Sequence, residues 1–133
     1  MKVDTSQNPY FLRFAQGLTG VEDFGHCRTI AFYERDVLAV VVYNAVEDKN
    51  CGISIAANNP KWCTRTVLRC SFGYPFIQLG LNRVTGVIRA SNERALSLNQ
   101  RLGFKHEGEM REYYDNGESA MIYGLTKSEC KWI

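Results

Sequence analysis

The sequence predicts an α/β sandwich, a mixed β-sheet covered by helices, in one domain over residues 1–133. Strand-like runs of β-branched residues alternate with segments whose apolar residues recur every three or four positions. Elements in such an alternation pack as helices on a sheet. The 133 residues suffice for one hydrophobic core and are too few for two. A hydrophobic content of 45% and a charged content of 23% are ordinary for a soluble globular protein.

A helix and three strands are predicted in the first half of the chain. Apolar residues recur at helical spacing over residues 9–19, with Asn8 as N-cap, a proline in the first turn and Gly20 at the end. Two strand-like runs, residues 28–34 and 37–46, flank a short polar break and predict an antiparallel hairpin. The second run is apolar on both faces, which is typical of a central strand. A further short strand is predicted over residues 51–57.

One long helix with an internal break is predicted in the middle of the chain. Asn59 and Pro60 repeat the cap-and-proline signal and Gly80 marks an end, so we expect a helix over residues 59–79. Pro75 should kink or break it near residues 71–72, because proline has no N–H to donate and collides with the preceding turn. The expected buried stripe is Leu68, Phe72, Phe76 and Leu79.

Residues 83–111 are the most informative stretch, and they read as a strand, a capped helix and a second strand. A β-branched run over residues 83–90 predicts the first strand. Asn92, after Ser91, offers an N-cap, and Glu93 places a negative charge at the positive end of the helix dipole. Gly103 closes the helix in the left-handed conformation. The apolar stripe of this helix is Ala95, Leu98 and Leu102.

The last part of the chain predicts a hairpin. Strands are expected over residues 104–113 and 118–125, joined around Asn116-Gly117, which is a strong hairpin signal. The closing Trp132 and Ile133 should dock either on the protein's own sheet or on a second copy, so a homodimer is a reasonable expectation.

Composition excludes several classes of protein. A formal net charge of +2 is too small to indicate nucleic-acid binding by itself. No apolar run is long enough to cross a bilayer, and the first residues do not begin a signal peptide. Five cysteines without a C-x-x-C pair indicate neither a disulfide framework nor a zinc site. Reduced thiols in a cytoplasmic protein without a metal are the expected state.

The motif residues of the second half resemble the GNAT superfamily, the acetyl-CoA-dependent N-acetyltransferases, and the resemblance covers roughly residues 37–126. It implies a GNAT-like, mixed and mostly antiparallel twisted sheet flanked by helices. The likeness is greatest to the branch that acetylates protein N-termini and to small GNAT-like proteins of phages and prophages. The family has a strand before its first helix, and the short N-terminal segment leaves open whether that strand is missing here. The matching residues are Asn92, Ala95, Leu98, Leu102-Gly103-Phe104, Glu107-Gly108 and Arg111.

The resemblance also implies an acetyl-CoA site along residues 53–57 and at the start of the next helix. Backbone N–H groups at a helix N-terminus bind the pyrophosphate in this fold. The family's glycine motif falls on Asn59, Trp62 and Thr64, so no glycine is present, and Trp62 would crowd the pyrophosphate unless its indole swings out. Arg65 and Arg69 are further candidates for phosphate contacts. The expected cofactor-binding residues are Ile55, Ala56, Ala57, Lys61, Trp62, Cys63, Thr64, Arg65, Asn92 and Ala95.

Asn99 and Glu47 are the expected catalytic residues. Asn99 stands where many GNAT enzymes have a tyrosine that protonates the leaving thiolate; an amide can hydrogen-bond the sulfur but is not a general acid. The alternative for Asn99 is an exposed polar position on an amphipathic helix. Glu47 ends the central strand, where a carboxylate could take the amine's proton through water, and the alternative is an ordinary polar turn. His106 is read as a solvated or packed strand residue.

Two functions of different classes follow. The first is an N-acetyltransferase that moves acetyl from acetyl-CoA to a primary amine by direct attack, with an acceptor that the resemblance suggests is a protein amine. The second is a catalytically inactive GNAT-fold protein that acts as a binding or regulatory partner, favoured by Asn99 and by the missing glycines. Nucleic-acid binding ranks third, because a phosphate-bearing cofactor accounts for several of the basic residues.

Overall fold

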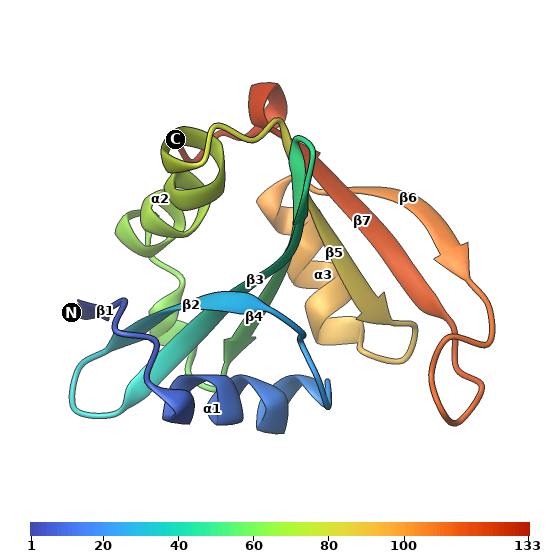
Figure 1. Ribbon diagram of the computed structural model, residues 1–133, viewed down its shortest axis with the longest axis horizontal. Helices are drawn as coiled ribbons and strands as arrows, with labels where there is room; N and C mark the ends of the chain where they lie inside the picture. The colour runs from blue at the N-terminus through green and yellow to red at the C-terminus, as the bar shows by residue number, and fades with distance from the viewer.

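The computed structural model describes residues 1–133 as one seven-stranded sheet with helices on both faces (Figure 1). The strand order is β1-β2-β3-β4-β5-β7-β6, and every neighbouring pair is antiparallel except β4 and β5. The strands are β1 (Lys2–Asp4), β2 (Cys27–Tyr33), β3 (Val37–Glu47), β4 (Asn50–Ala57), β5 (Arg83–Arg89), β6 (Lys105–Met110) and β7 (Ala120–Thr126). The helices are α1 (Pro9–Thr19), α2 (Arg65–Gly73) and α3 (Glu93–Leu102), with helical turns η1 (Pro60–Trp62), η2 (Tyr74–Gln78) and η3 (Lys127–Glu129). The predicted mixed, mostly antiparallel sheet is confirmed.

Two hydrophobic clusters cover the two faces of the sheet. Helix α1 packs Phe11 and Ala15 against one face, where they meet Val40 and Val42 of β3. Val41, between them in β3, points to the other face, because successive residues of a strand alternate. Helices α2 and α3 cover that second face with a larger cluster. The fully apolar central strand expected from the sequence is therefore β3. No helix in the structure has the length and apolar character that crossing a membrane requires.

The N-terminal segment contains the strand whose presence was left open. Strand β1 is short and pairs with β2 in antiparallel register, from Lys2 opposite Tyr33 to Asp4 opposite Ala31. Helix α1 begins and ends as predicted. The Asn8 side chain accepts a hydrogen bond from the Tyr10 N–H at 3.0 Å, and Gly20 closes the helix with φ +75°.

The prediction of one long helix over residues 59–79 is wrong at its start. Asn59 does cap a turn, and its side chain accepts a bond from the Lys61 N–H at 2.9 Å, but that turn is the single 3-10 turn η1. Trp62 ends it with an indole that is only 6% exposed. Burying this side chain in the core turns the chain inward, so a second N-cap is needed. Thr64 supplies it by accepting a bond from the Val67 N–H at 3.2 Å, and α2 begins at Arg65.

Pro75 breaks the helix, two residues later than predicted. Helix α2 ends at Gly73 and continues as the π-helical turn η2. Pro75 has no N–H to give to the carbonyl of Ser71, and the hydroxyl of Tyr43 donates to that carbonyl instead, at 2.6 Å. The π-helical turn also changes the helical phase, so the predicted burial of Leu79 is wrong. Leu79 is exposed, whereas the other residues of the predicted stripe, Leu68, Phe72 and Phe76, are buried.

The C-terminal part agrees with the predicted order, with shorter strands. Asn92 caps α3 by accepting a bond from the Ala95 N–H at 3.2 Å, and Gly103 ends it with φ +104°. The connection between β6 and β7 spans residues 111–119, a longer excursion than the predicted hairpin. Trp132 docks on its own chain, where its indole N–H donates to the Leu102 carbonyl at 2.9 Å.

Candidate functional site

The centre of the sheet opens where its only parallel pair diverges. Strands β4 and β5 are paired from Asn50 opposite Arg83 to Gly52 opposite Thr85, and nowhere beyond. Both strands continue, β4 to Ala57 and β5 to Arg89, so the β5-facing backbone edge of residues 53–57 has no strand partner. Figure 1 shows the two strands close at one end and far apart at their C-terminal ends. The sheet thus presents free backbone donors and acceptors at its middle.

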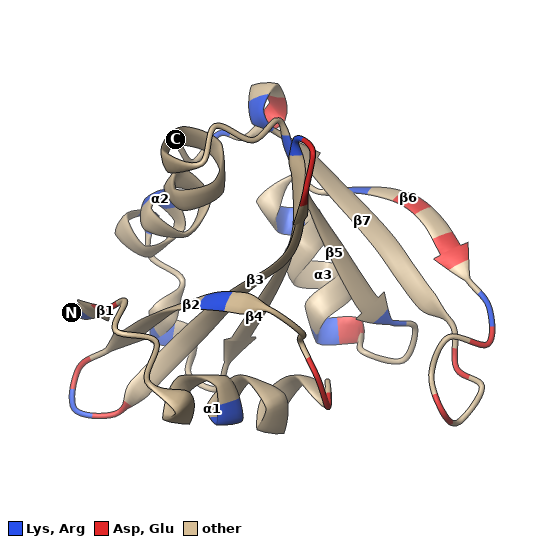
Figure 2. Cartoon of the chain, viewed as in Figure 1, with Lys and Arg blue, Asp and Glu red and all other residues tan.

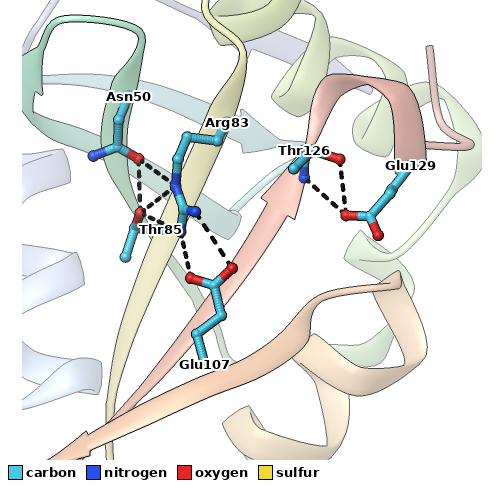
Figure 3. A network of polar contacts seen from close by, with 6 residues as sticks. All are labelled: Asn50, Arg83, Thr85, Glu107, Thr126 and Glu129. Carbon is cyan, nitrogen blue, oxygen red and sulfur yellow. Dashed lines mark hydrogen bonds and ion pairs between the residues drawn. The ribbon is translucent and has the colours of Figure 1, made fainter.

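A polar network fixes the closed end of this opening (Figure 3). The Thr85 hydroxyl donates to Asn50 Oδ1 at 2.7 Å, and Arg83 Nε donates to the same oxygen at 3.2 Å. Arg83 also forms an ion pair with Glu107 of β6, with Nη2 2.7 Å from Oε1. Gly124 of β7 makes room for this pair, because a Cβ at that position would collide with the Glu107 carboxylate. Side chains of β4, β5 and β6 are thereby tied together at one point.

A cavity of about 470 Å³ lies on the α1 face of the opening. Because it is lined by residues of both β4 and β5, it extends across the gap between them. The loop after α1 and the β6–β7 connection form its walls. Asn44, beside a bulge in β3, donates from Nδ2 to the Phe24 carbonyl at 3.0 Å and so holds the loop after α1 in place. The polar and aromatic lining residues are Glu22, Asp23, Phe24, Asn44, Asn50, Ser54, Thr85, Arg89, Tyr113, Tyr114 and Asp115.

One cation of the cavity wall is already neutralised. Arg89 Nη1 lies 3.2 Å from Glu118 Oε1, and its guanidinium carbon lies 3.8 Å above the centre of the Tyr114 ring. Hydrogen bonds from Ser91 and then from Arg89 hold the pKa of Glu118 at about 2, so Glu118 is ionised at neutral pH. Burial raises the pKa of Tyr114. Tyr113 packs edge-on against Tyr114 with ring centres 4.9 Å apart, and it keeps an exposed face.

The start of α2 carries the predicted phosphate-binding residues. Lys61, Arg65 and Arg69 are exposed and form no ion pair in the protein. The N–H groups of residues 61–64 are all bonded within η1 and the turn that follows. The first two N–H groups of α2, of Arg65 and Thr66, have no intrahelical acceptor and point out of the helix start. The N–H groups that have no intrahelical acceptor therefore lie at the true beginning of α2, a few residues after the family's glycine position.

Trp62 does not stand in the way of that site. Its indole packs into the core cluster on the α2 face rather than outward over the helix start. The expected crowding at the family's glycine position does not arise, because the side chain lies inward in the core, whereas the sequence suggested that it would have to swing out. Cys63, next to it, is exposed, and Ile55 and Ala57 pack partly buried on the same face. Ala56 points to the other face, against α1.

Asn99 lies on the sheet-facing side of α3, and it is not the fully exposed residue of the alternative reading. An ideal Cβ built on Gly86 of β5 would lie 2.8 Å from Asn99 Nδ2. Gly86 follows Thr85, the last residue of β5 that is paired with β4. The Asn99 amide is thus next to the point of divergence, on the face opposite the cavity. Ala95 lies one turn before Asn99 and Asn92 two turns before it, where the Asn92 side chain accepts the hydrogen bond of the Ala95 N–H in the helix cap.

The structure does not bring Glu47 to this cavity. Glu47 is exposed at the β3–β4 turn, opposite Asn50, and lines a separate polar depression of about 510 Å³. Asn50 lines both hollows and lies between them. The sequence reasoning missed the wall residues Glu22, Asp23 and Asn44. They lie in a loop and at a strand bulge, without a spacing motif that could have indicated them.

Comparison with known proteins identifies the fold. No protein-family model and no curated protein matches the chain. A variant of spermidine N-acetyltransferase from Vibrio cholerae is similar with a TM-score of 0.75, at 15% identity over 100% of this chain and 98% of its own. Ribosomal-protein-S5-alanine acetyltransferase from Vibrio fischeri is similar with a TM-score of 0.67, at 17% identity over 79% of this chain and 64% of its own. The chain has the fold of the GNAT acetyltransferases.

Proposed function

We propose that this protein is an N-acetyltransferase that moves acetyl from acetyl-CoA to a primary amine by direct attack. The observation that carries the proposal is the divergence of β4 and β5, with a cavity on one face and a basic helix start on the other. Acyl transfer requires an amine and a thioester held in line, and the gap between the strands lets two ligands meet from opposite faces. The pairing of β4 with β5 covers only three residues although both strands continue beyond it.

The residues present fit acetyl-CoA. When bound, this co-substrate supplies a thioester carbonyl that an amine can attack. The exposed cations Lys61, Arg65 and Arg69 and the free N–H groups of Arg65 and Thr66 suit its phosphates. The unpaired edge of β4 over residues 53–57 suits the amide groups of the pantetheine arm, which can add to it like a strand.

The chain's own groups would assist the transfer by hydrogen bonding. A backbone N–H of residues 53–57 would polarise the thioester carbonyl, because charge develops on that oxygen during attack. Asn99 Nδ2 would donate to the leaving sulfur from its place above Gly86. In this proposal Glu47 takes the amine's proton only through water that passes Asn50, the residue that lines both hollows.

Titration calorimetry with acetyl-CoA tests the proposal, with CoA and a plain nucleotide for comparison. We expect micromolar binding that depends on the pantetheine arm. Arg65→Glu should weaken it at least about tenfold by reversing a charge beside the phosphates. Arg13→Glu is the matched control, an exposed arginine of α1 on the other face of the sheet, and should bind like the unmodified protein. A folded protein that does not bind at millimolar acetyl-CoA would contradict the proposal.

An inactive GNAT-fold binding protein is the second candidate. Two observations favour it: an amide at position 99 in place of a general acid, and the local bonding of the N–H groups of residues 61–64. Such a protein would bind acetyl-CoA or a partner but would release no free thiol in the presence of any amine. A thiol-release assay over a panel of amines therefore separates the two candidates. The five free cysteines are consistent with the reducing cytoplasm that we propose for either one.

A further inference from the structure

The cavity on the α1 face has an excess of negative charge. Glu22 and Asp23 on the loop after α1 and Asp115 on the β6–β7 connection line it, and none of the three takes part in an ion pair. Arg89 is the only cation of the lining, and Glu118 neutralises it. The walls therefore carry three uncompensated carboxylates. A cavity lined by one sign of charge concentrates ligands of the opposite sign.

The carboxylates come from two different segments that line the cavity. Figure 2 shows red both on the loop that follows α1 and on the β6–β7 connection, with the end of β5 between them in this view. These segments are about 90 residues apart in the sequence, at positions 22–23 and 115. An ammonium group placed between the two segments is attracted by the carboxylates of both.

Two neutral lining residues offer an acceptor or an aromatic face to a cation. Asn44 uses its amide nitrogen for the Phe24 carbonyl, which leaves Oδ1 free to accept a hydrogen bond. The guanidinium of Arg89 occupies the face of Tyr114, so Tyr113, with half of its surface exposed, is the ring available to an ammonium group. The volume of about 470 Å³ is in the range of small-molecule sites.

On the basis of the proposed function, we infer that the acceptor is a small aliphatic diamine or polyamine. One ammonium group is held by the carboxylates, and a terminal amine, in its neutral form, reaches the gap between β4 and β5. The nitrogen forms the new amide bond with the acetyl carbon as the carbon–sulfur bond breaks. The proton lost from nitrogen goes to water, and the electron pair of the broken bond stays on sulfur. A second charge on the acceptor is needed because the attacking amine itself must be uncharged.

Direct binding of amines to the protein without acetyl-CoA tests this inference. Titrations would compare a linear triamine, a monoamine of similar chain length and a short peptide with a free N-terminus. We expect the triamine to bind at least about tenfold more tightly than the monoamine, and its affinity to fall as salt is added. A peptide that binds more tightly than the triamine would overturn the inference in favour of a protein acceptor. Equal affinity for triamine and monoamine would overturn it as well.

Carboxamide variants locate the site. The triple variant Glu22→Gln, Asp23→Asn and Asp115→Asn should weaken triamine binding roughly tenfold, since exposed ion pairs contribute about two- to fivefold each. Asp23→Asn keeps the oxygen that accepts the Gly25 N–H at 2.7 Å, so the loop should fold normally. Asp36→Asn, in the β2–β3 turn, is the matched control. A triple variant with unchanged affinity and an unchanged melting temperature would refute the assignment.

A separate measurement of acetyl-CoA binding distinguishes failure of the proposed acetyl transfer from failure of the inferred acceptor class. The triple variant should bind acetyl-CoA like the unmodified protein, because the cofactor residues lie at the start of α2. Triamine binding without acetyl-CoA binding would overturn the proposed transfer and support the cation site. Acetyl-CoA binding without triamine binding would overturn the acceptor class and leave the transfer intact.

Discussion

Gly86 allows a sharp test of the role assigned to Asn99. An alanine at position 86 would place its Cβ 2.8 Å from Asn99 Nδ2, closer than such atoms approach in proteins, so one of the two groups must move. The amide is the end of a flexible side chain and the Cβ is fixed to a strand. Gly86→Ala should therefore displace the Asn99 amide and leave the backbone of β5 in place.

The expected loss of activity corresponds to one hydrogen bond. A neutral hydrogen bond contributes about 1 kcal/mol, which is roughly a fivefold change in rate. We expect Gly86→Ala to lower the rate of thiol release, at saturating acetyl-CoA and amine, by roughly that factor. Stability should change by less than about 1 kcal/mol, because the strain is relieved by a side-chain movement. Gly17→Ala, in α1 with open space around it, is the control and should keep full activity.

A double-mutant cycle decides whether the effect passes through Asn99. Asn99→Ala removes the amide and makes room for the new methyl group, so Gly86→Ala should have no further effect in that background. Two effects that multiply would show that Gly86 acts independently of Asn99. Full activity of Gly86→Ala beside a strong loss in Asn99→Ala would refute the steric argument.

Three further predictions concern the fold around the site. Gly103→Val forces a β-branched residue to φ +104° at a cost of about 1–2 kcal/mol, so the melting temperature followed by circular dichroism should fall roughly 3–8 °C; no change would contradict the helix end. Trp62→Gly creates a glycine of the family motif but empties a core position, so unfolding in urea should show a loss of about 3–5 kcal/mol, and a more stable variant would refute the buried placement. Folding lowers the pKa of Glu118 from 4.5 to about 2, so its ionised carboxylate stabilises the folded protein at neutral pH. This contribution to the free energy of unfolding is lost as the pH falls from about 5 towards 2. Glu118→Gln should flatten this part of the stability–pH curve, and identical curves would exclude the contribution.

Local signals in the sequence predicted most of the architecture. The predicted caps at Asn8, Asn92 and Gly103 are confirmed, because the hydrogen bonds that form each cap join residues within about one helical turn. The cap at Asn59 formed only a 3-10 turn, since the burial of Trp62 overrode it. Tertiary packing decided that case, and no spacing along the chain could have indicated it.

The site was less predictable than the fold. Asn99 and the basic start of α2 could be found from the resemblance, because the motif fixes their positions in sequence. The residues of the cavity wall could not be found from the sequence, because Glu22 and Asp115 come to line one cavity only through the arrangement of two loops that are distant in sequence. Glu47 lies outside the cavity, beyond the β3 bulge between Asn44 and the turn, and the sequence gives no signal of that bulge.

The three-residue pairing of β4 with β5 also divides the hydrogen-bonded ladder of the sheet into two blocks. Strands β1 to β4 form one antiparallel block and β5 to β7 another, and ladder hydrogen bonds connect the blocks only at residues 50–52 and 83–85. Local opening at this junction breaks few bonds, so its backbone amides should exchange with deuterium sooner than those of β3, even though Cys51 and Val84 are fully buried. The gap that admits the ligands would then be able to widen without unfolding either block.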